Sequence, residues 1–298
     1  MTPVTEEKRQ QLLNFIDRVL ATEEAIKGVV GIGSVASGQM RPESDIDAVI
    51  FMDPLDLFIV PAESIWNPED GTYHSIFDDK NEIPDGIQLD FARYNLAEWS
   101  APEYEWLEGN RAELSVGWIA YDPTGEIETL IAQKTIYNDD VRQQRLDEAL
   151  IWLDQHLTWS KPLKKWHAYG PVIAFDRLSA AYRYLVQALF AYNRQWQIWR
   201  NREMQELLHL SWLPADFESK VLIAANTPSL DEAGYKARAD MLTELFQELL
   251  AELTDSGDYS TMPVDQAFIR QNQEIGRAWN MEEWNRFHKI RELGKPLR

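Results

Sequence analysis

The stretch GIGSVASGQMRPESDID, from Gly31 to Asp47, decides how the first half of this chain folds. An apolar run leads into Gly33-Ser34, and the acid pair formed by Asp45 and Asp47 leads into a second apolar run. This order predicts a strand, a tight glycine-serine turn, a short helix and loop, and a second strand that opens with two carboxylates. Because residues two apart on a strand point to the same face, we expect Asp45 and Asp47 side by side at the mouth of a sheet.

Two features of this stretch favour binding of a phosphate and a divalent cation. Backbone N–H groups at a Gly-Ser turn that enters a helix converge and favour an anion. Two neighbouring carboxylates supply the hard oxygen ligands that Mg²⁺ prefers. Together these features are the arrangement needed to hold a nucleoside triphosphate through Mg²⁺. A solvated acidic turn after a strand would explain the acids alone, but not the Gly-Ser turn.

A third carboxylate, Asp90, lies in the segment GIQLDFARY, residues 86–94. Apolar and polar residues alternate along this segment, which predicts a half-buried strand with Asp90 on the face opposite the apolar one. An Asp-x-Asp pair is a weak signal when it stands alone, because acid pairs are common in loops. The turn, the pair and the third acid in this order form a much more specific pattern.

This pattern resembles the nucleotidyltransferase superfamily, which includes DNA polymerase β and the two-domain bacterial aminoglycoside-type adenylyltransferases. Members have a Gly-Ser pair, a spacer, an Asp-x-Asp pair and a third carboxylate on a later strand. Here Gly33-Ser34, Asp45, Asp47 and Asp90 match those parts in that order. The resemblance covers the core motifs firmly and the second half of the chain only loosely.

The resemblance implies a role for each matching residue. Asp45 and Asp47 are the expected ligands of Mg²⁺, with two ions expected. Asp90 is the expected third ligand of the catalytic ion, the general base, or both. Ser34 and the backbone around Gly33 are expected to hold the β- and γ-phosphates of a nucleoside triphosphate, with ATP as the expected co-substrate.

Two further residues are candidates for nucleotide binding. Ser44 directly precedes the acid pair and would either touch a phosphate or fix the loop through a local side-chain-to-backbone hydrogen bond. Arg194 lies in the segment AYNRQW, residues 191–196, which resembles an Asn-Arg element at this place in bacterial two-domain nucleotidyltransferases. Arg194 is therefore a candidate contact for the triphosphate or the base.

The hydrophobic period changes from strand-like to helical along the chain, and a length of 298 residues suggests two domains. We predict an α+β fold, in which a small mixed β-sheet nucleotidyltransferase core with helices on one side is followed by an all-α domain. The expected domains are a catalytic domain over 1–135 and a helical domain over 136–298 that closes on substrate and nucleotide. Thr5 is the expected N-cap of the first helix. The predicted helices cover about 5–20, 139–157, 175–196, 231–253 and 264–293, with a loop or broken segment at 159–171.

The net charge of −20 argues against nucleic acid as a partner, because phosphate neutralisation by a basic surface supplies most of that affinity. A strongly acidic surface instead attracts cations, so a cationic acceptor such as an aminoglycoside fits. The acidity would equally serve solubility alone, and an acceptor without cationic groups, such as a lincosamide, stays open. No apolar run approaches the roughly 20 residues that span a bilayer, so no membrane association is expected. The chain has no cysteine, which excludes disulfides and thiolate metal sites. A cytoplasmic enzyme is expected, and its oligomeric state stays open.

The sequence therefore predicts an Mg²⁺-dependent enzyme that moves a nucleoside monophosphate, with AMP expected, to a hydroxyl of a small acceptor and releases pyrophosphate. One alternative is an enzyme that nucleotidylates a protein, as some antitoxins do. Another is a nucleotide-binding regulatory module without transfer activity. The chain contains neither a Gly-x-Ser-x-Gly elbow nor a Gly-x-x-x-x-Gly-Lys-Ser/Thr loop, so hydrolase and P-loop chemistries have no support.

Overall fold

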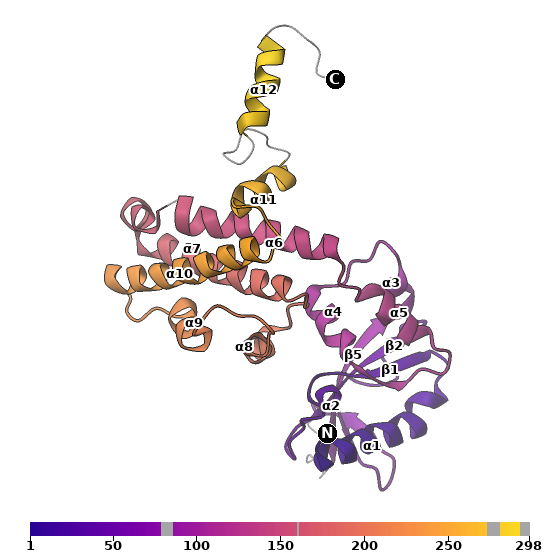
Figure 1. The fold of residues 1–298 in the computed structure, drawn as a ribbon. Coiled ribbons are helices and arrows are strands. Elements are labelled where there is room, and N and C mark those ends of the chain that lie inside the picture. Colours follow the sequence, from indigo (N-terminus) through magenta and orange to yellow (C-terminus); the bar gives the residue numbers. More distant parts are fainter. Residues whose placement is uncertain (79–85, 160, 273–280, 293–298) are drawn as a thin grey trace. The chain divides into compact units, whose positions relative to one another are not determined.

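A computed structural model of the chain describes residues 1–78, 86–159, 161–272 and 281–292. The chain divides into two compact units, Met1–Ile136 and Tyr137–Arg298. The first contains the β-sheet, and in the described part of the second all regular secondary structure is helical (Figure 1). The predicted α+β fold class is therefore confirmed. The division between the units lies next to the predicted domain boundary, and the functions assigned to the two domains stay predictions.

The first unit is built on a six-stranded mixed sheet with the strand order β4-β3-β5-β2-β1-β6. β2 pairs antiparallel with β1 and parallel with β5, so it lies near the centre of the sheet. The strands are β1 (Ile26–Gly31), β2 (Ile46–Met52), β3 (Glu63–Trp66), β4 (Tyr73–Ser75), β5 (Ile87–Asn95) and β6 (Trp118–Tyr121).

Helices cover both faces of this sheet, which corrects the expectation of helices on one side only. Helix α1 (Pro3–Arg18) packs its buried side chains into a cluster on one face. A second cluster on the other face contains residues of α3, α4 and α5. The reason lies in β2, whose side chains are almost all buried on both faces and therefore need apolar cover from both sides. The second-face helices are α3 (Leu96–Ser100), α4 (Glu108–Ser115) and α5 (Glu126–Lys134), and a short 3₁₀ turn, η1 (Leu20–Thr22), follows α1.

Helix α1 begins earlier than the sequence predicts. Its N-cap is Thr2, whose hydroxyl accepts the Thr5 N–H, and Pro3 occupies the first helical position. Thr5, the expected cap, is fully buried, and its hydroxyl accepts the backbone N–H of Met40 at 3.0 Å. The side chain is thus used in a tertiary contact, which a pattern of local caps does not reveal.

The long insertion between the two acid-bearing strands extends the sheet. Its first part returns as β3, which pairs antiparallel with β5, and β4 then pairs with β3. β4 is short and covers only three residues. Residues 79–85 of the insertion lie outside the described part of the chain.

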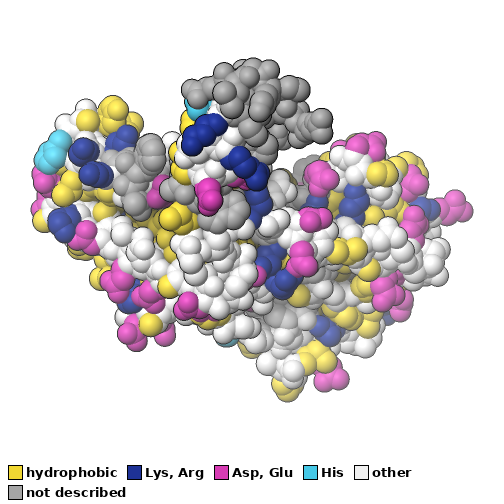
Figure 2. All heavy atoms as spheres, turned by 45° about the horizontal axis from the view of Figure 1, so that its top comes forward, with side chains coloured by type: hydrophobic (Ala, Val, Ile, Leu, Met, Phe, Trp, Pro, Cys, Tyr) yellow, Lys and Arg dark blue, Asp and Glu magenta, His cyan; other side chains and the backbone are white. Residues whose placement is uncertain are grey.

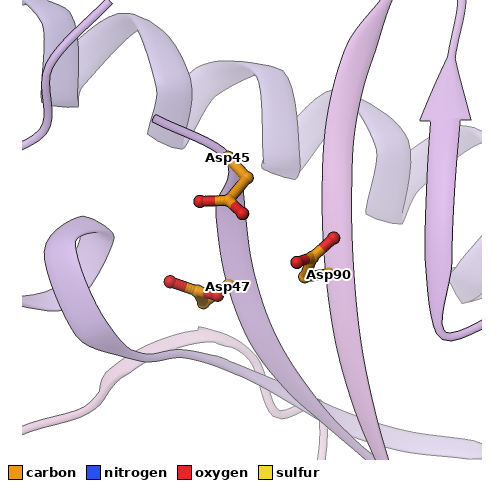
Figure 3. Close-up of side chains that lie close together, drawn as sticks. All are labelled: Asp45, Asp47 and Asp90. Carbon is orange, nitrogen blue, oxygen red and sulfur yellow. The ribbon is translucent and has the colours of Figure 1, made fainter. Parts of the chain in front are cut away.

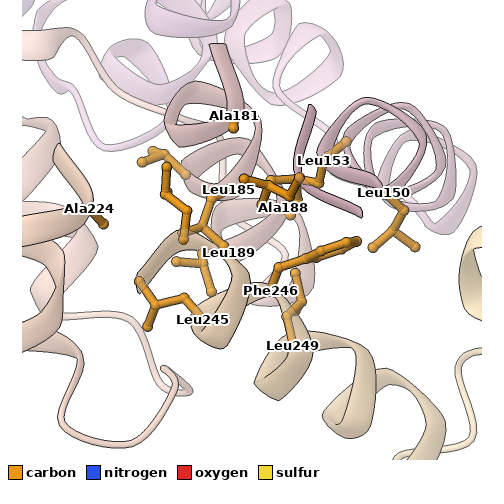
Figure 4. Packing of buried hydrophobic residues seen from close by; sticks show 14 of the residues in the cluster. Leu150, Leu153, Ala181, Leu185, Ala188, Leu189, Ala224, Leu245, Phe246 and Leu249 are labelled. Carbon is orange, nitrogen blue, oxygen red and sulfur yellow. The ribbon is translucent and has the colours of Figure 1, made fainter. Parts of the chain in front are cut away.

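The second unit has its own hydrophobic core between three long helices (Figure 4). Leucines of α6 (Asp139–Asp154), α7 (Pro162–Tyr192) and α10 (Glu232–Asp255) meet there around Phe246, which is fully buried. A π-helical turn, η2 (Gln155–Trp159), extends α6. The remaining helices are α8 (Arg200–Leu208), α9 (Phe217–Ala225), α11 (Pro263–Asn272) and α12 (Met281–Glu292). Among the described residues, we find no helix with the length and apolar character that a membrane crossing requires.

Helix α7 shows where local signals and structure differ. The segment predicted as a loop or break before it is mostly helical. Lys161, with a φ of +43°, lies just before the helix, and Gly170, with a φ of +78°, interrupts the helix before Pro171. Glycine suits this backbone conformation, and proline prevents the regular hydrogen-bond ladder from continuing. The helix ends at Tyr192, before the predicted end at residue 196.

A buried ionic network ties α11 to α6. Asp147 on α6 is 3% exposed, and it accepts hydrogen bonds from the Tyr259 hydroxyl at 2.6 Å and from the Arg270 Nε at 2.7 Å. Burial raises the pKa of the Tyr259 hydroxyl, and the Asp147 carboxylate adds to the effect. The tyrosine therefore remains a hydrogen-bond donor at neutral pH.

We expect Asp147→Ala to destabilise the helical unit by about 3 kcal/mol, because it leaves the Arg270 charge without its buried partner. Chemical denaturation followed by circular dichroism measures the loss. Asp240→Ala is the matched control, since Asp240 pairs with Lys236 at the surface with 63% of its side chain exposed. Such exposed pairs contribute about 0.3–0.5 kcal/mol. Equal effects of the two substitutions would contradict the assignment.

Candidate functional site

Three aspartates converge at the start of β2 and on the neighbouring part of β5. Asp47 and Asp90 are direct partners in the parallel register of β2 and β5. Asp45 directly precedes β2 and lies two residues before Asp47. The three carboxylates each offer an oxygen within 4.8 Å of the others (Figure 3), and all three side chains are half-buried. The structure therefore brings together the three acids that the sequence singled out.

The alternation of each strand explains the common face. Residues two and four positions after Asp47, namely Val49 and Phe51, belong to the second apolar cluster, which is covered by α3, α4 and α5. Tyr94, four positions after Asp90 on β5, packs against the same cluster. The triad thus occupies the start of a sheet face whose later part is covered by helices. Burial by those helices stops before the acids, which leaves the carboxylates accessible.

The Asp90 carboxyl lies in an environment that raises its pKa. Burial raises the pKa of its carboxyl, the Gln88 amide hydrogen bond at 3.3 Å opposes that rise, and the nearby carboxylates of Asp45 and Glu63 raise the pKa further. Like charges held together favour the protonated form of one member, and a bound cation would reverse this by neutralising the repulsion. The pKa of Asp90 therefore depends on the other acids and would depend on any metal bound between them.

Glu63 is an acid of this face that sequence analysis missed. It lies on β3 directly opposite Asp90 in the antiparallel register, so the two side chains share one face of the sheet. Its carboxylate contributes to the raised pKa of Asp90. The segment ESIW, residues 63–66, is too short to show a clear strand period, so no local signal pointed to the sheet.

The Gly33-Ser34 turn lies beside the acid strand. The Ile32 N–H donates to the Asp47 carbonyl oxygen at 3.0 Å, which ties the start of the turn to β2. Gly33 adopts a φ of +62°, a left-handed conformation that is strained for other residues. Helix α2 (Gly33–Ser37) follows and ends at Gly38. The predicted strand–turn–helix therefore forms, with Ser34 in the first turn of a single-turn helix.

Ser44 takes part in the local hydrogen bonding of the loop. Its hydroxyl accepts the Arg41 N–H at 3.2 Å, and its own N–H donates to the Arg41 carbonyl at 3.1 Å. This is the loop-fixing role that the sequence offered as one of its two options. A phosphate contact of Ser44 stays a prediction.

Arg194 belongs to the second unit, just beyond the end of α7. It has a φ of +58°, and its Nη1 pairs with Asp139 at 2.6 Å while half of its side chain is exposed. The neighbouring Asn193 is structural, because its amide donates to the Leu189 and Trp212 carbonyls and accepts the Trp212 N–H. Contact of Arg194 with a nucleotide stays a prediction.

Chemically, the triad can hold a divalent cation. Its three carboxylates come from a rigid pair of neighbouring strands, and oxygen donors of this kind are what hard cations such as Mg²⁺ and Mn²⁺ select. The Gly33-Ser34 turn lies beside them, tied to β2 by the hydrogen bond from the Ile32 N–H to the Asp47 carbonyl. The described residues thus combine cation ligands on the two central strands with a neighbouring glycine-containing turn.

Among the comparisons with known proteins, only the search of solved structures finds matches. No protein-family model matches the chain, and no curated protein matches it. Among solved structures, the chain is similar to a nucleotidyltransferase-like protein from Exiguobacterium sibiricum. The two are 10% identical, the match covers 94% of this chain and 87% of the other, and the TM-score is 0.43. A likeness at this level does not transfer the neighbour's activity to this chain.

The electrostatics of Asp90 predict a pH-dependent gain in stability on its neutralisation. Because its pKa is raised in the folded protein, the ionised carboxylate destabilises the fold at neutral pH, and the penalty disappears as the pH falls through the raised value. We expect Asp90→Asn, measured in a chelator, to raise the melting temperature at pH 7 by a few degrees. The difference should vanish below the ordinary aspartate range.

Asp70→Asn provides a control of opposite sign. Hydrogen bonds from Thr72 lower the pKa of the Asp70 carboxyl, so its ionised form is favoured by folding. Its neutralisation should not raise the melting temperature. If Asp90→Asn lowered the melting temperature at pH 7, repulsion within the triad would not be the dominant effect.

Proposed function

We propose that this chain is a metal-dependent nucleotidyltransferase that moves a nucleoside monophosphate from a triphosphate to a hydroxyl of a small acceptor. The observation that supports this most is the convergence of Asp45, Asp47 and Asp90 within 4.8 Å of one another beside the Gly33-Ser34 turn. A phosphate-binding turn and a carboxylate cluster together suit a triphosphate bound through metal. ATP is the proposed donor, because the sequence pattern resembles adenylyltransferases.

In this proposal the acceptor hydroxyl oxygen attacks the α-phosphorus. The bond from that phosphorus to the oxygen bridging the β-phosphate breaks, and pyrophosphate leaves. Ser34 and the backbone at Gly33 hold the β- and γ-phosphates, which orients the leaving group. Asp90 accepts the proton of the acceptor hydroxyl if it is not tightly ligated, since a metal-bound carboxylate is a poor base. Positioning of this kind supplies most of the catalysis in phosphoryl transfer.

Asp45, Asp47 and Asp90 are the proposed ligands of Mg²⁺, with two ions expected. Bound there, the metal would neutralise charge on the phosphates and on the entering and leaving oxygens. The fit rests on this site's own chemistry: three half-buried carboxylates lie close together, and two of their neighbours, Glu63 and Gln88, add no positive charge.

A cationic acceptor is the version of the proposal that the surface chemistry favours. Glu63 lies across from Asp90 on the same face and offers a carboxylate beyond the three proposed metal ligands. Acidic side chains occur in many separate places on the face drawn in Figure 2, in keeping with the net charge of −20. Such a field raises the local concentration of polyamine-like molecules. An aminoglycoside-like antibiotic is the proposed example, and nucleic acid is the disfavoured partner.

Two other functions remain as alternatives to be separated by experiment. A protein acceptor would keep the same chemistry and change only what supplies the hydroxyl. A regulatory module would bind the triphosphate without transfer, and the presence of all three carboxylates argues against it. The proposed role of the second unit, including Arg194, is to add cationic contacts to the bound triphosphate.

Pyrophosphate release is the test of this proposal. The wild-type protein is incubated with Mg²⁺, each of the four nucleoside triphosphates, and a panel of aminoglycosides, lincosamides and polyols. We expect acceptor-dependent release with ATP. We expect Asp47→Asn to reduce it by at least about 100-fold, because the substitution removes one metal ligand charge while keeping the side-chain shape.

Asp17→Asn is the matched control, because Asp17 is exposed on α1 and its substitution changes the net charge by the same amount. It should leave release unchanged. Full activity of Asp47→Asn would show that the triad does not bind the catalytic metal. Triphosphate binding without release for any acceptor on the panel would favour a protein acceptor or a regulatory module.

A further inference from the structure

Helix α1 and its N-cap residue form hydrogen bonds with the connection, residues 33–44, that runs from the Gly-Ser turn to the acid pair. The N–H of Thr2 donates to the Gly38 carbonyl at 3.0 Å, and the Thr5 hydroxyl accepts the Met40 N–H at 3.0 Å. Arg9 donates through Nε to the Val35 carbonyl and through Nη2 to the Ala36 carbonyl, both at 2.9 Å. The same helix therefore contacts the connection at three successive places.

The two bonds from Arg9 satisfy backbone groups that α2 cannot satisfy itself. In a longer helix, the carbonyls of Val35 and Ala36 would accept the N–H groups four residues on. Here the chain turns away at Gly38: the Gln39 N–H goes to the Ser34 carbonyl, and the Met40 N–H goes to Thr5. The planar guanidinium of Arg9 takes the place of both missing donors.

Arg9 itself is held against the sheet. Its guanidinium carbon lies 4.5 Å from the ring centre of Trp118 on β6. Gly31 allows this arrangement, because a Cβ at that position would lie 2.9 Å from the Trp118 ring and 3.0 Å from Val35. The tryptophan and α2 thus both approach β1 closely, and Arg9 bridges them. This is a fixed geometry rather than a solvated surface arginine.

The consequence for the candidate site follows from chain connectivity. A helix of five residues, Gly33–Ser37, has too few internal hydrogen bonds to stand alone and depends on tertiary contacts. Ser34 lies in it, and Asp45 ends the loop that follows it. Any drift of α2 would move Ser34 away from β2 and loosen the approach to Asp45.

We propose that Arg9 is a positioning residue of the nucleotidyl-transfer site, which sets the placement of Ser34 and Asp45 by capping α2 through the carbonyls of Val35 and Ala36. This inference rests on the proposed function for its catalytic meaning. Arg9 is not a ligand of metal or phosphate in this assignment. Its bonds go to backbone carbonyls, so it acts through the connection that it holds.

The choice of arginine makes the inference specific. A guanidinium donates two hydrogen bonds in a fixed fork and stacks on an aromatic face, whereas an ammonium does neither in the same way. Arg9→Lys should therefore retain only part of the effect, and Arg9→Ala should retain none. The three buried apolar side chains of α1, which are Leu12, Phe15 and Ile16, are unchanged in each variant.

The test compares Arg9→Ala, Arg9→Lys and the control Arg18→Ala in the full chain. Arg18 lies on the same helix and also donates to a carbonyl, that of Pro68 at 2.6 Å, but in the β3–β4 loop rather than the connection. Three measurements are made: hydrogen exchange of peptides covering 33–45, affinity for Mn²⁺, and the kcat and KM of pyrophosphate release.

For Arg9→Ala we expect faster hydrogen exchange over 33–45. We also expect Mn²⁺ binding to weaken by about tenfold, because the loss of residues that support metal ligands weakens metal affinity by about this much in other proteins. We expect kcat/KM to fall by about 10- to 100-fold, with kcat affected as well as KM. Arg9→Lys should lie between Arg9→Ala and wild type in all three. Arg18→Ala should match wild type over 33–45, in Mn²⁺ affinity and in kcat.

Wild-type exchange over 33–45 and wild-type Mn²⁺ affinity in Arg9→Ala would overturn the inference. Equal losses in Arg9→Ala and Arg18→Ala would also overturn it, because the effect would then be general destabilisation of α1. If wild type binds Mn²⁺ but releases no pyrophosphate under any condition, the proposed function fails instead. Exchange and Mn²⁺ affinity then still decide whether Arg9 positions the acid pair.

Discussion

The parallel pairing of β2 with β5 is the constraint on which the candidate site depends. It sets Asp47 directly beside Asp90, and the two-residue period of a strand brings Asp45 close to both. A shift of one residue in that register would turn one acid to the opposite face, into the apolar cluster beneath α1. The register is secured by burial, because β2 has apolar side chains packed on both faces. The chemistry at the mouth of the sheet therefore depends on hydrophobic packing farther along the same two strands.

Holding these acids together costs electrostatic free energy, which the packing of the rest of the first unit offsets. Burial and neighbouring carboxylates raise the pKa of Asp90, which means that the ionised triad repels itself in the metal-free protein. Such a cluster persists because the strands that present it are fixed by their cores and not by the acids. The same repulsion favours the proposed cation, since its binding would relieve it. Electrostatic repulsion and the proposed metal binding would thus be two consequences of one geometry.

Support for the site comes from parts of the chain that carry none of the motif residues. The side chains of Thr5 and Arg9 on α1 form hydrogen bonds with the backbone of the connection between the turn and the acid pair. These side chains supply hydrogen bonds that the short helix α2 and the turn after it cannot make internally. In the helical unit, Asp147 on α6 instead bonds to other side chains, those of Tyr259 and of Arg270 on α11. The central strands β2 and β5 are thus left to present the carboxylates.

The sequence by itself determined the elements whose signals are local. The Gly-Ser turn, the Asp45–Asp47 pair, the strand that bears Asp90 and the helical second half could all be predicted, because turn residues and hydrophobic period act over a few neighbouring positions. It could not place Glu63 opposite Asp90, extend cover to both faces of the sheet, or assign Thr5 and Arg9 to the connection. Those features depend on pairing between residues far apart in the chain, such as Glu63 with Asp90 and Arg9 with Val35. Only the tertiary structure decides them, since the free energy of such contacts exists only after the strands and α1 have packed.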